Sequence, residues 1–520
     1  MFKNHPKQLL AASLTNMGER FGFYVMMALL TLFLTTKFGL DGKTAGFIYS
    51  TFYFLIYVLA LVGGIIADKT KNFKGTILAG LVLMAVGYGV LAIPTETPVP
   101  DAKMTLFLGL SCLGLFIIAF GNGLFKGNLQ ALVGQMYDDE KYSQYRDPGF
   151  NLFYMFINVG AIFAPVTAVG IRNWWVIRNG FTYESSLPEL CHNFLRGDIT
   201  AEGTTRLEGF MSQMNFSGSA EAFVNEYLNV FTTGFHYAFA IAIVAMAISL
   251  VIYLVNQSKF PDPASKKVAV TADGEKVVPD MPKDEVRQRI YALFAVFAVV
   301  IFFWFSFHQN GLTLTFFARD YTDLSAINLN LGFTRIVGAE LFQTINPLCV
   351  VFLTPIVMAV FGWLRARGQE PSTPKKIAIG MGIAAIAFVV MAIGSIGLPL
   401  KSEVDAAGGL SDAERVTPFL LIGTYIILTI AELFISPLGI SFVSKVAPPQ
   451  YQGIMQGLWL CATGLGNQLL FIGAIFYDRI PLKYTWTIFV VACLISMFLM
   501  LFMLKWLERV SGESKEEVAA

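Results

Sequence analysis

Long apolar segments alternate with short polar ones along most of the chain, and this pattern predicts a bundle of membrane-spanning helices. A bilayer core about 30 Å thick needs roughly 20 mostly apolar residues per helix. Twelve segments reach that length: residues 8–36, 43–67, 75–94, 104–133, 148–171, 234–256, 287–318, 336–364, 375–399, 416–445, 451–478 and 483–507. We therefore expect an all-α membrane protein with twelve transmembrane helices and both termini on one side.

Two longer polar segments interrupt the pattern. Residues 257–287 show little apolar periodicity and divide the segments into six and six, so they predict a linker between an N-terminal bundle, 1–256, and a C-terminal bundle, 288–520. Residues 172–233 predict either a small ordered cap or a mobile insertion. Two six-helix halves are what the major facilitator fold requires, with the substrate held near the membrane midplane between them.

Lysine and arginine in short loops indicate which side faces the cytoplasm. The turns on the side of the termini carry Lys3, Lys7, Lys69, Lys71, Lys74, Arg365, Arg367, Lys375 and Lys376. The opposite loops carry fewer, namely Lys37, Lys43, Lys103 and Lys401. We therefore expect an integral, multi-pass protein of a bacterial plasma membrane, with cytoplasmic termini and linker and with the 172–233 insertion outside.

The composition agrees with a lipid environment and excludes other classes. Of 520 residues, 55% are hydrophobic and 14% charged, a balance that a soluble core cannot hide. The net charge of +1 gives no reason to expect a nucleic-acid partner. Only Cys191 of the five cysteines lies in a polar stretch, so we expect no disulfide, and we predict neither a metal site nor a cofactor.

Ionisable residues inside the apolar segments are functional candidates, because each costs several kcal/mol in lipid. Asn16, Glu19 and Arg20 lie at i, i+3 and i+4, so they share one helical face. Lys126 in the fourth segment needs a carboxylate nearby. Glu19 is the candidate, which predicts an ion pair between Glu19 and Lys126.

These residues belong to motifs that follow one another along the chain. They are Glu19-Arg20-Phe21-x-x-Tyr24, Gly121-x-Gly-x-Phe125-Lys126-x-Asn128, Arg146-Asp147-Pro148-Gly149-Phe150-x-x-Phe153-Tyr154-x-x-Ile157-Asn158-x-Gly160, Phe342-Gln343-Thr344-Ile345-Asn346-Pro347-Leu348, Glu432-Leu433-x-x-Ser436-Pro437-x-Gly439, and Met455-x-Gly457-x-Trp459 with Gly466-Asn467. Together they resemble the signatures of the proton-dependent oligopeptide transporter family. The third motif, on the fifth helix, is the most specific match.

The resemblance implies a central site lined from both halves, by Tyr24, Tyr57, Lys126, Asn158, Trp304, Asn346, Glu432, Trp459 and Thr463. A peptide carries an amine and a carboxylate, so Glu432 on one half and Lys126 on the other can orient it. The aromatic rings can accept varied side chains, although packing alone is the alternative reading for each of them. The family's proton coupling is expected to involve Glu19, Arg20, His308 and Glu432.

The chain departs from the family at three positions. Asn16 stands where the family has a glutamate, and Met27 replaces an arginine that would bind the peptide carboxylate. His308 occupies a position where the family usually has an acid, and its reference pKa near 6.5 suits reversible protonation. These changes weaken the expectation of an ordinary peptide substrate and of the family's usual coupling.

Three functions remain open on the sequence alone. The first is a proton-coupled symporter of di- and tripeptides, and the second is a carrier of another small solute, such as a modified peptide or an organic anion, without proton coupling. The third, a membrane-embedded enzyme, is disfavoured because the chain has no HExxH motif and no nucleophile elbow. We therefore expect a transporter whose partners are a small molecule, protons and the lipid bilayer. The sequence predicts no oligomeric state.

Overall fold

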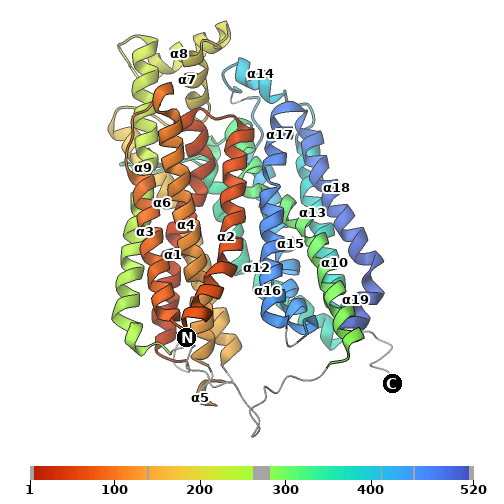
Figure 1. The fold of residues 1–520 in the computed structure, drawn as a ribbon. Helices are drawn as coiled ribbons and strands as arrows, with labels where there is room; N and C mark the ends of the chain where they lie inside the picture. The colour runs from red at the N-terminus through yellow and green to blue at the C-terminus, as the bar shows by residue number, and fades with distance from the viewer. Residues whose placement is uncertain are drawn as a thin grey trace.

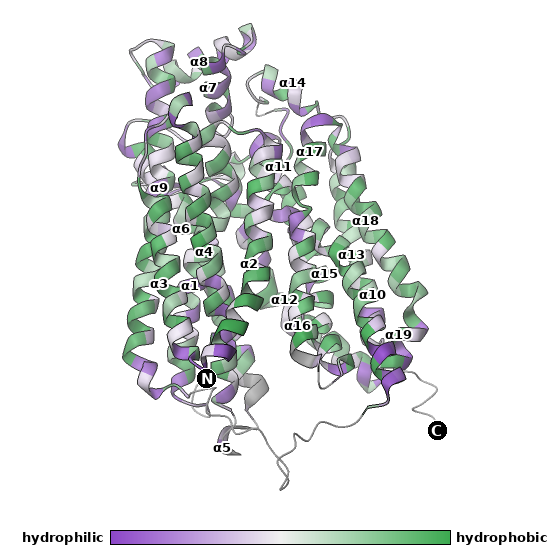
Figure 2. Ribbon diagram, in the orientation of Figure 1, coloured by the Kyte–Doolittle hydropathy of each residue, from purple (hydrophilic) through white to green (hydrophobic). Residues whose placement is uncertain are grey.

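The computed structural model describes residues 5–137, 140–143, 145–261, 281–411, 413–448 and 451–513. Twelve of its helices are long and apolar enough to cross a membrane, which confirms the predicted fold class. Figure 2 shows their middle portions coloured as hydrophobic, and hydrophilic residues gather at the two ends of the bundle.

The first half of the chain supplies six of these helices and a cap (Figure 1). Its elements are α1 (Gln8–Phe38), α2 (Gly42–Thr70), α3 (Phe73–Ala92), α4 (Asp101–Gln135), α5 (Glu140–Ser143), α6 (Arg146–Arg178), α7 (Leu187–Arg196), α8 (Ala201–Gln213), α9 (Ala220–Asn256) and the 3₁₀ turn η1 (Gln257–Lys259). Helices α1, α6 and α9 pack together, as do α2, α3 and α4.

The second half supplies the other six. Its elements are α10 (Lys283–Phe307), η3 (His308–Gly311), α11 (Thr313–Asp320), η4 (Ser325–Ile327), β1 (Leu329–Asn330), β2 (Arg335–Ile336), η5 (Ala339–Thr344), α12 (Ile345–Ala366), α13 (Thr373–Gly394), α14 (Lys401–Ala406), α15 (Pro418–Val446), α16 (Gln452–Gln468), α17 (Phe471–Arg479), α18 (Leu482–Phe502) and α19 (Leu504–Ser511). The strands β1 and β2 form an antiparallel pair.

The insertion is folded, as the first of its two predicted alternatives has it. Helix α6 continues to Arg178, and α9 begins at Ala220 rather than at 234 because the Ser219 hydroxyl caps it by accepting from the Ala222 amide at 3.2 Å. Between them, α7 and α8 form a cap at the end of the molecule opposite both termini (Figure 1). Residues 262–280 of the predicted linker lie outside the described residues, and α10 already begins at Lys283.

Glycines let the helices of the first half approach closely. A Cβ atom on Gly63 of α2 would lie 2.1 Å from the carbonyl oxygen of Gly123 on α4. The same holds between α3 and α4, where a Cβ on Gly80 would lie 2.6 Å from the Gly121 carbonyl. Because lipid gives helices little hydrophobic reason to associate, such backbone contact is a main source of packing energy in membranes.

Two membrane-spanning segments are broken at facing positions, which the sequence pattern did not predict. The seventh changes from α10 to η3 at His308, and the eleventh stops at Gln468 before α17 resumes at Phe471. Gln309 joins the two breaks by donating from Nε2 to the carbonyl oxygens of Phe305 and Leu470, each at 3.2 Å. Discontinuous helices of this kind mark substrate and ion sites in secondary transporters.

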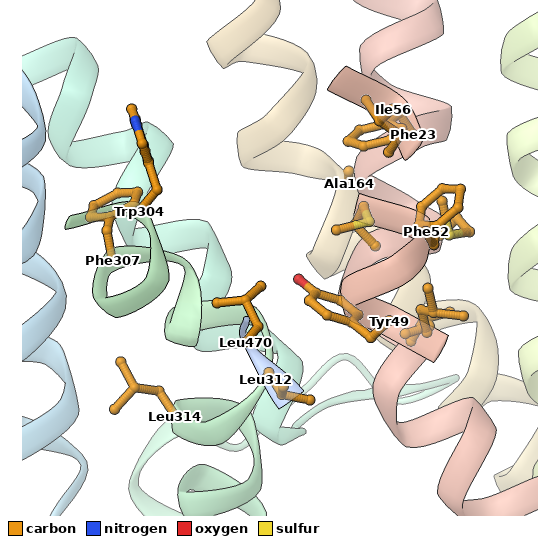
Figure 3. Packing of buried hydrophobic residues seen from close by; sticks show 14 of the residues in the cluster. Phe23, Tyr49, Phe52, Ile56, Ala164, Trp304, Phe307, Leu312, Leu314 and Leu470 are labelled. Carbon is orange, nitrogen blue, oxygen red and sulfur yellow. The ribbon is translucent and has the colours of Figure 1, made fainter. Parts of the chain in front are cut away.

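Apolar packing joins the two halves beside these breaks. Figure 3 shows the ring of Tyr49 reaching from α2 toward Leu312 and Leu470 of the second half. A Cβ atom on Gly311 would lie 2.0 Å from the Tyr49 hydroxyl oxygen, so a larger residue there would force the Tyr49 ring to move. The Thr31 hydroxyl donates to the Gly311 carbonyl at 3.0 Å and adds a polar contact between α1 and η3.

Candidate functional site

Glu19 and Arg20 form a closed polar unit on α1. Arg20 donates from Nε to Glu19 Oε2 at 2.5 Å and from Nη2 to Oε1 at 2.6 Å, and both side chains are buried. Asn122 of α4 donates from Nδ2 to the same Oε1 at 2.9 Å. The predicted ion pair between Glu19 and Lys126 is therefore wrong, because the Arg20 guanidinium already donates a hydrogen bond to each oxygen of the Glu19 carboxylate.

Lys126 on α4 remains without a carboxylate partner among the described residues. Its Nζ lies 5.2 Å from the centre of the Tyr57 ring on α2, a cation–π contact. The side chain is partly exposed and lies within Coulombic range of Arg20 and Glu19. A lysine in a helical span that has an aromatic face but no counter-ion is free to meet an anionic group of a solute.

Glu432 on α15 is the corresponding acid of the second half. It accepts from Asn346 Nδ2 at 2.7 Å, and the same Nδ2 lies 3.1 Å from the Thr429 hydroxyl. No ion pair to Glu432 exists among the residues that the structure describes. Tyr24, Tyr53 and Tyr57 of the first half all lie within Coulombic range of it. The tyrosines therefore share one central region with Glu432.

His308 lies at the break in the seventh span and is held on three sides. Its ring stacks on Trp304 with centroids 4.8 Å apart and planes 18° apart, and the Tyr53 ring lies 4.8 Å away on α2. Its Nδ1 is 2.5 Å from Asn467 Oδ1 of α16. With the amide assigned this way, Nδ1 carries the hydrogen and Nε2 is left to exchange a proton. Lys126 lies within Coulombic range of the ring.

Three predicted site residues make contacts within their own half. Asn158 donates to the Tyr154 carbonyl of its own helix at 3.3 Å, and the Thr463 hydroxyl donates to the Trp459 carbonyl at 3.2 Å. Trp459 is buried against Phe297, with ring centroids 6.2 Å apart, and against Gly439. These contacts are typical of packing, so a role for the three in binding stays a prediction.

Asn122, Asn467 and Tyr53 are the neighbours of the site that sequence reasoning did not assign. Asn122 and Asn467 lie inside quoted motifs, but an amide gives no sign in the sequence of which side chain it will orient. Tyr53 offered a clearer signal, because it precedes Tyr57 by four residues and so shares its helical face. Asn122 Oδ1, Asn467 Nδ2 and Trp304 Nε1 are buried without a protein partner in the structure.

A second polar region, also missed by sequence reasoning, joins the halves toward the cap. Arg172 of α6 pairs with Glu340 of η5, and neither side chain is exposed to solvent. The Arg172 guanidinium also lies 4.6 Å from the centre of the Tyr183 ring. Asn173 donates to the carbonyl oxygens of Arg335 at 2.7 Å and Val337 at 2.9 Å. This contact is fully desolvated and has to break if the two halves separate at that end.

Twelve spanning helices, broken spans at a central polar site and charged groups from both halves define a multi-pass membrane protein of the secondary-transporter class. A family model described as the POT family matches residues 74–279 and 275–487. Because these matches cover more than half of the chain, the protein belongs to the POT family. This confirms the family resemblance and the prediction of a transporter rather than an enzyme.

Comparisons with individual proteins agree. The chain is 28% identical over 484 residues to the peptide transporter YePEPT of Yersinia enterocolitica, covering 90% of this chain and 87% of that protein. It is 26% identical over 466 residues to dipeptide and tripeptide permease A of Escherichia coli, covering 89% and 82%. A POT family transporter solved with 5-aminolevulinic acid superposes with a TM-score of 0.70 at 21% identity, covering 97% of each chain, which supports the fold.

Proposed function

We propose that this protein carries di- and tripeptides across the membrane by alternating access, in symport with protons. The observation that carries the proposal is the pair of opposite charges, Lys126 on the first half and Glu432 on the second, neither ion-paired among the described residues. A zwitterionic peptide offers each of them its missing partner, the carboxylate for Lys126 and the amine for Glu432. The names of the relatives from Yersinia and Escherichia support the same substrate class.

The remaining site residues complete the proposed pocket. Tyr24 and Tyr57 of the first half are partly exposed and offer aromatic faces that tolerate varied peptide side chains. Trp304 of the second half is buried and stacks on His308, so it contributes to the pocket by holding that ring. Asn346 orients the Glu432 carboxylate. Asn158, Trp459 and Thr463 pack behind the residues that contact the substrate, through the contacts described above.

Proton coupling is assigned to His308 and Glu432, with Glu19 and Arg20 as a fixed pair that both stabilises α1 and sets the local charge. Glu19 accepts two hydrogen bonds from Arg20 and one from Asn122, so its carboxylate is held in a structural contact. His308 is the residue type that titrates most readily near neutral pH, and it lies at a helix break where the two halves meet.

Alternating access is supported by where the halves are held together. Ion pairs between residues 1–256 and 288–520 lie at the cap end, among them Arg172–Glu340, Arg319–Glu189 and Lys401–Glu189. We assign this end to the outside and both termini to the cytoplasm, in a bacterial plasma membrane. The structure then corresponds to the state closed to the outside.

A second candidate is a carrier of another small solute, such as a modified peptide or an organic anion, without proton coupling. Met27 is buried where the family resemblance implies an arginine for the peptide carboxylate, and Asn16 cannot titrate. One solved relative of the fold is in complex with 5-aminolevulinic acid, a solute that contains no peptide bond.

Uptake into proteoliposomes distinguishes these functions. Purified protein is reconstituted, and accumulation of a labelled dipeptide is followed with and without an inward proton gradient. The proposal expects accumulation above equilibrium only with the gradient. Equal, non-concentrative uptake in both conditions contradicts proton symport and favours the second candidate, and no uptake of any dipeptide contradicts the peptide substrate.

A further inference from the structure

The cap is bound to the second half by a dense set of polar contacts. Lys401 of α14 donates from Nζ to Glu189 of α7, at 2.9 Å to Oε1 and 3.1 Å to Oε2. Arg206 of α8 donates to the carbonyl oxygens of Gly409 and Leu410, each at 2.7 Å. These contacts join an element of the first half to a loop of the second at the outer end, where Figure 1 shows α7 and α8 close to α14.

Carboxylates outnumber cations around Lys401. Asp405 is bonded to the same Nζ, and Asp320 Oδ2 lies 3.9 Å from it. Arg319 Nε lies 2.6 Å from Asp320 Oδ1, and Arg319 Nη2 lies 3.5 Å from Glu189 Oε2. Two cations, Lys401 and Arg319, therefore face the three acids Glu189, Asp320 and Asp405. Beside them lies a cavity of about 250 Å³, which Glu189, Asp405 and a fourth acid, Asp478 of α17, line.

The other polar groups around this cluster do not change the balance. His192 of α7 bonds through Nε2 to the Thr36 carbonyl at 2.6 Å, and Arg196 donates to the Gly39 carbonyl at 2.7 Å. Asp41 caps α2 by accepting from the Thr44 amide. The Tyr477 hydroxyl donates to Asp320 at 3.0 Å, which leaves Glu189 and Asp405 to share Lys401.

We propose that Glu189 and Asp405 form a proton-binding site that is complete only when the cap meets α14, so that acid outside the membrane stabilises the closed outer end. That this end of the molecule faces the outside rests on the proposed function, whereas the site itself rests on the geometry. Two carboxylates on one ammonium, in a cluster with excess negative charge, hold a proton more readily than either alone. When the cap leaves α14, Glu189 and Asp405 separate and the proton is released.

The titration of the two groups agrees with this arrangement. Burial and the adjacent Glu189 carboxylate raise the pKa of Asp405 to about 7. Burial acts in the same direction on Glu189, but Lys401 and Arg319 outweigh it and lower the pKa of that group. An acid with a raised pKa favours the assembled state in full below its ordinary value near 4, and this contribution disappears as pH rises through about 7. Low pH therefore favours the contact between the cap and α14.

The experiment measures the distance between cap and α14 without any substrate. Spin labels are placed at Thr205→Cys on α8 and Ser402→Cys on α14, both exposed, in the full chain with its native cysteines replaced. Distance distributions of the reconstituted protein are recorded from about pH 5 to about pH 9. We expect the short distance to lose population as pH rises, with a midpoint near 7. A distribution that does not change, or that changes in the opposite direction, overturns the proposal.

Variants assign the proton to this pair. Asp405→Asn mimics the protonated acid and keeps an acceptor for Lys401, so the short distance should persist at every pH. Glu202→Gln, at an exposed acid of α8, is the matched control and should behave as wild type. An unchanged midpoint in Asp405→Asn assigns the titration elsewhere and contradicts the site. If that variant does not fold, Asp405→Glu keeps the charge but displaces it, and its midpoint has to move.

Because no solute is transported in this measurement, its failure leaves the proposed peptide transport intact. Equally, absence of peptide uptake does not alter the expected response of the labels to pH.

Discussion

Charged residues are arranged differently at the outer end of the interface between the halves and at its central level. At the outer end Arg172 meets Glu340, and Lys401 meets Glu189, so charges of one half form ion pairs with charges of the other. At the central level the charges have no such partner: Lys126 faces the Tyr57 ring, and Glu432 accepts from the Asn346 amide. Ion pairs between the halves stabilise the closed outer end, whereas the unpaired central charges can bind the charged groups of a solute.

The largest effect is expected from breaking the outer pair on one side only. Arg172→Met leaves Glu340 buried without a counter-ion, which costs about 3–5 kcal/mol of stability. Arg172→Met with Glu340→Leu should recover most of this, because a buried pair replaced by apolar residues is often close to neutral. Thermal unfolding in detergent measures both variants. Arg365→Met is the control, since the Arg365 side chain is 73% exposed and water screens its pair with Glu370. A double variant as unstable as the single one contradicts this account.

Removing the central cation should abolish transport without unfolding the protein. Lys126→Ala takes away a charge-assisted contact with the substrate carboxylate, a loss of about 2–5 kcal/mol, or about 30-fold to more than 1,000-fold in uptake. Because Lys126 has no ion-pair partner in the described part of the chain, the melting temperature should change little. Lys103→Ala, at an exposed lysine paired with Glu96, is the matched control. Uptake like that of wild type would remove Lys126 from the site.

Glu432→Gln tests the acid of the other half. The amide keeps the hydrogen bond to Asn346 but loses the attraction for an ammonium group, which is worth about 1.5–3 kcal/mol, or about tenfold to 150-fold in affinity. Peptides with a free amine should lose affinity by this factor, and N-acetylated peptides should lose little. Competition for labelled dipeptide measures both. An equal loss for the two classes assigns Glu432 to gating or proton transfer instead.

His308→Gln separates coupling from binding. Glutamine keeps a polar group near Asn467 but cannot take up a proton near neutral pH, so proton-driven accumulation should disappear while exchange of substrate down its own gradient continues. Counterflow and gradient-driven uptake in the same proteoliposomes give the two rates. If the variant still concentrates substrate in response to an inward proton gradient, His308 is a packing residue and the coupling group lies elsewhere.

The contrast between the two regions also explains what the sequence could predict. The spans depend on long apolar segments, so their number and order could be predicted from composition and length. The breaks at His308 and at Gln468 could not, because a short 3₁₀ turn inside an apolar segment leaves the hydropathy pattern unchanged. The start of α9 was placed late because polar residues among the first turns after Ser219 lower their mean hydropathy below that of a membrane span. The spacing of Phe223, Val224, Tyr227 and Leu228 on one face does fit an amphipathic helix.

The site was predictable in part. Lys126 and Glu432 are rare charges in apolar segments, so the cost of placing them in lipid identified them. Their partners were not predictable from that cost, and the sequence therefore suggested Glu19 for Lys126, whereas Arg20 is adjacent and takes the carboxylate. The outer pair joins Arg172, directly after the predicted fifth segment, to Glu340, which lies inside the predicted eighth segment and 168 residues further along the chain. The acid at Glu340 was therefore a signal that the sequence offered, but its partner could not be inferred over that separation. Only the fold brings them together.

The smallest effect is expected at Met27, where a flexible apolar side chain stands in place of a guanidinium. Met27 is buried on α1, so a peptide carboxylate has Lys126 as its nearest unpaired cation, a point charge without the two parallel bonds of an arginine. A C-amidated peptide still offers Lys126 a carbonyl oxygen, and we expect it to compete less than about tenfold more weakly than the free acid, since one hydrogen bond is weakened rather than lost. Competition of matched dipeptides against labelled substrate measures the ratio, with an N-acetylated peptide as the control for the other terminus. A preference for the free carboxylate far above tenfold would mean that a second cation has replaced the missing arginine. Arg20 is then the first to test, because its release from Glu19 would supply the two parallel bonds that Met27 cannot.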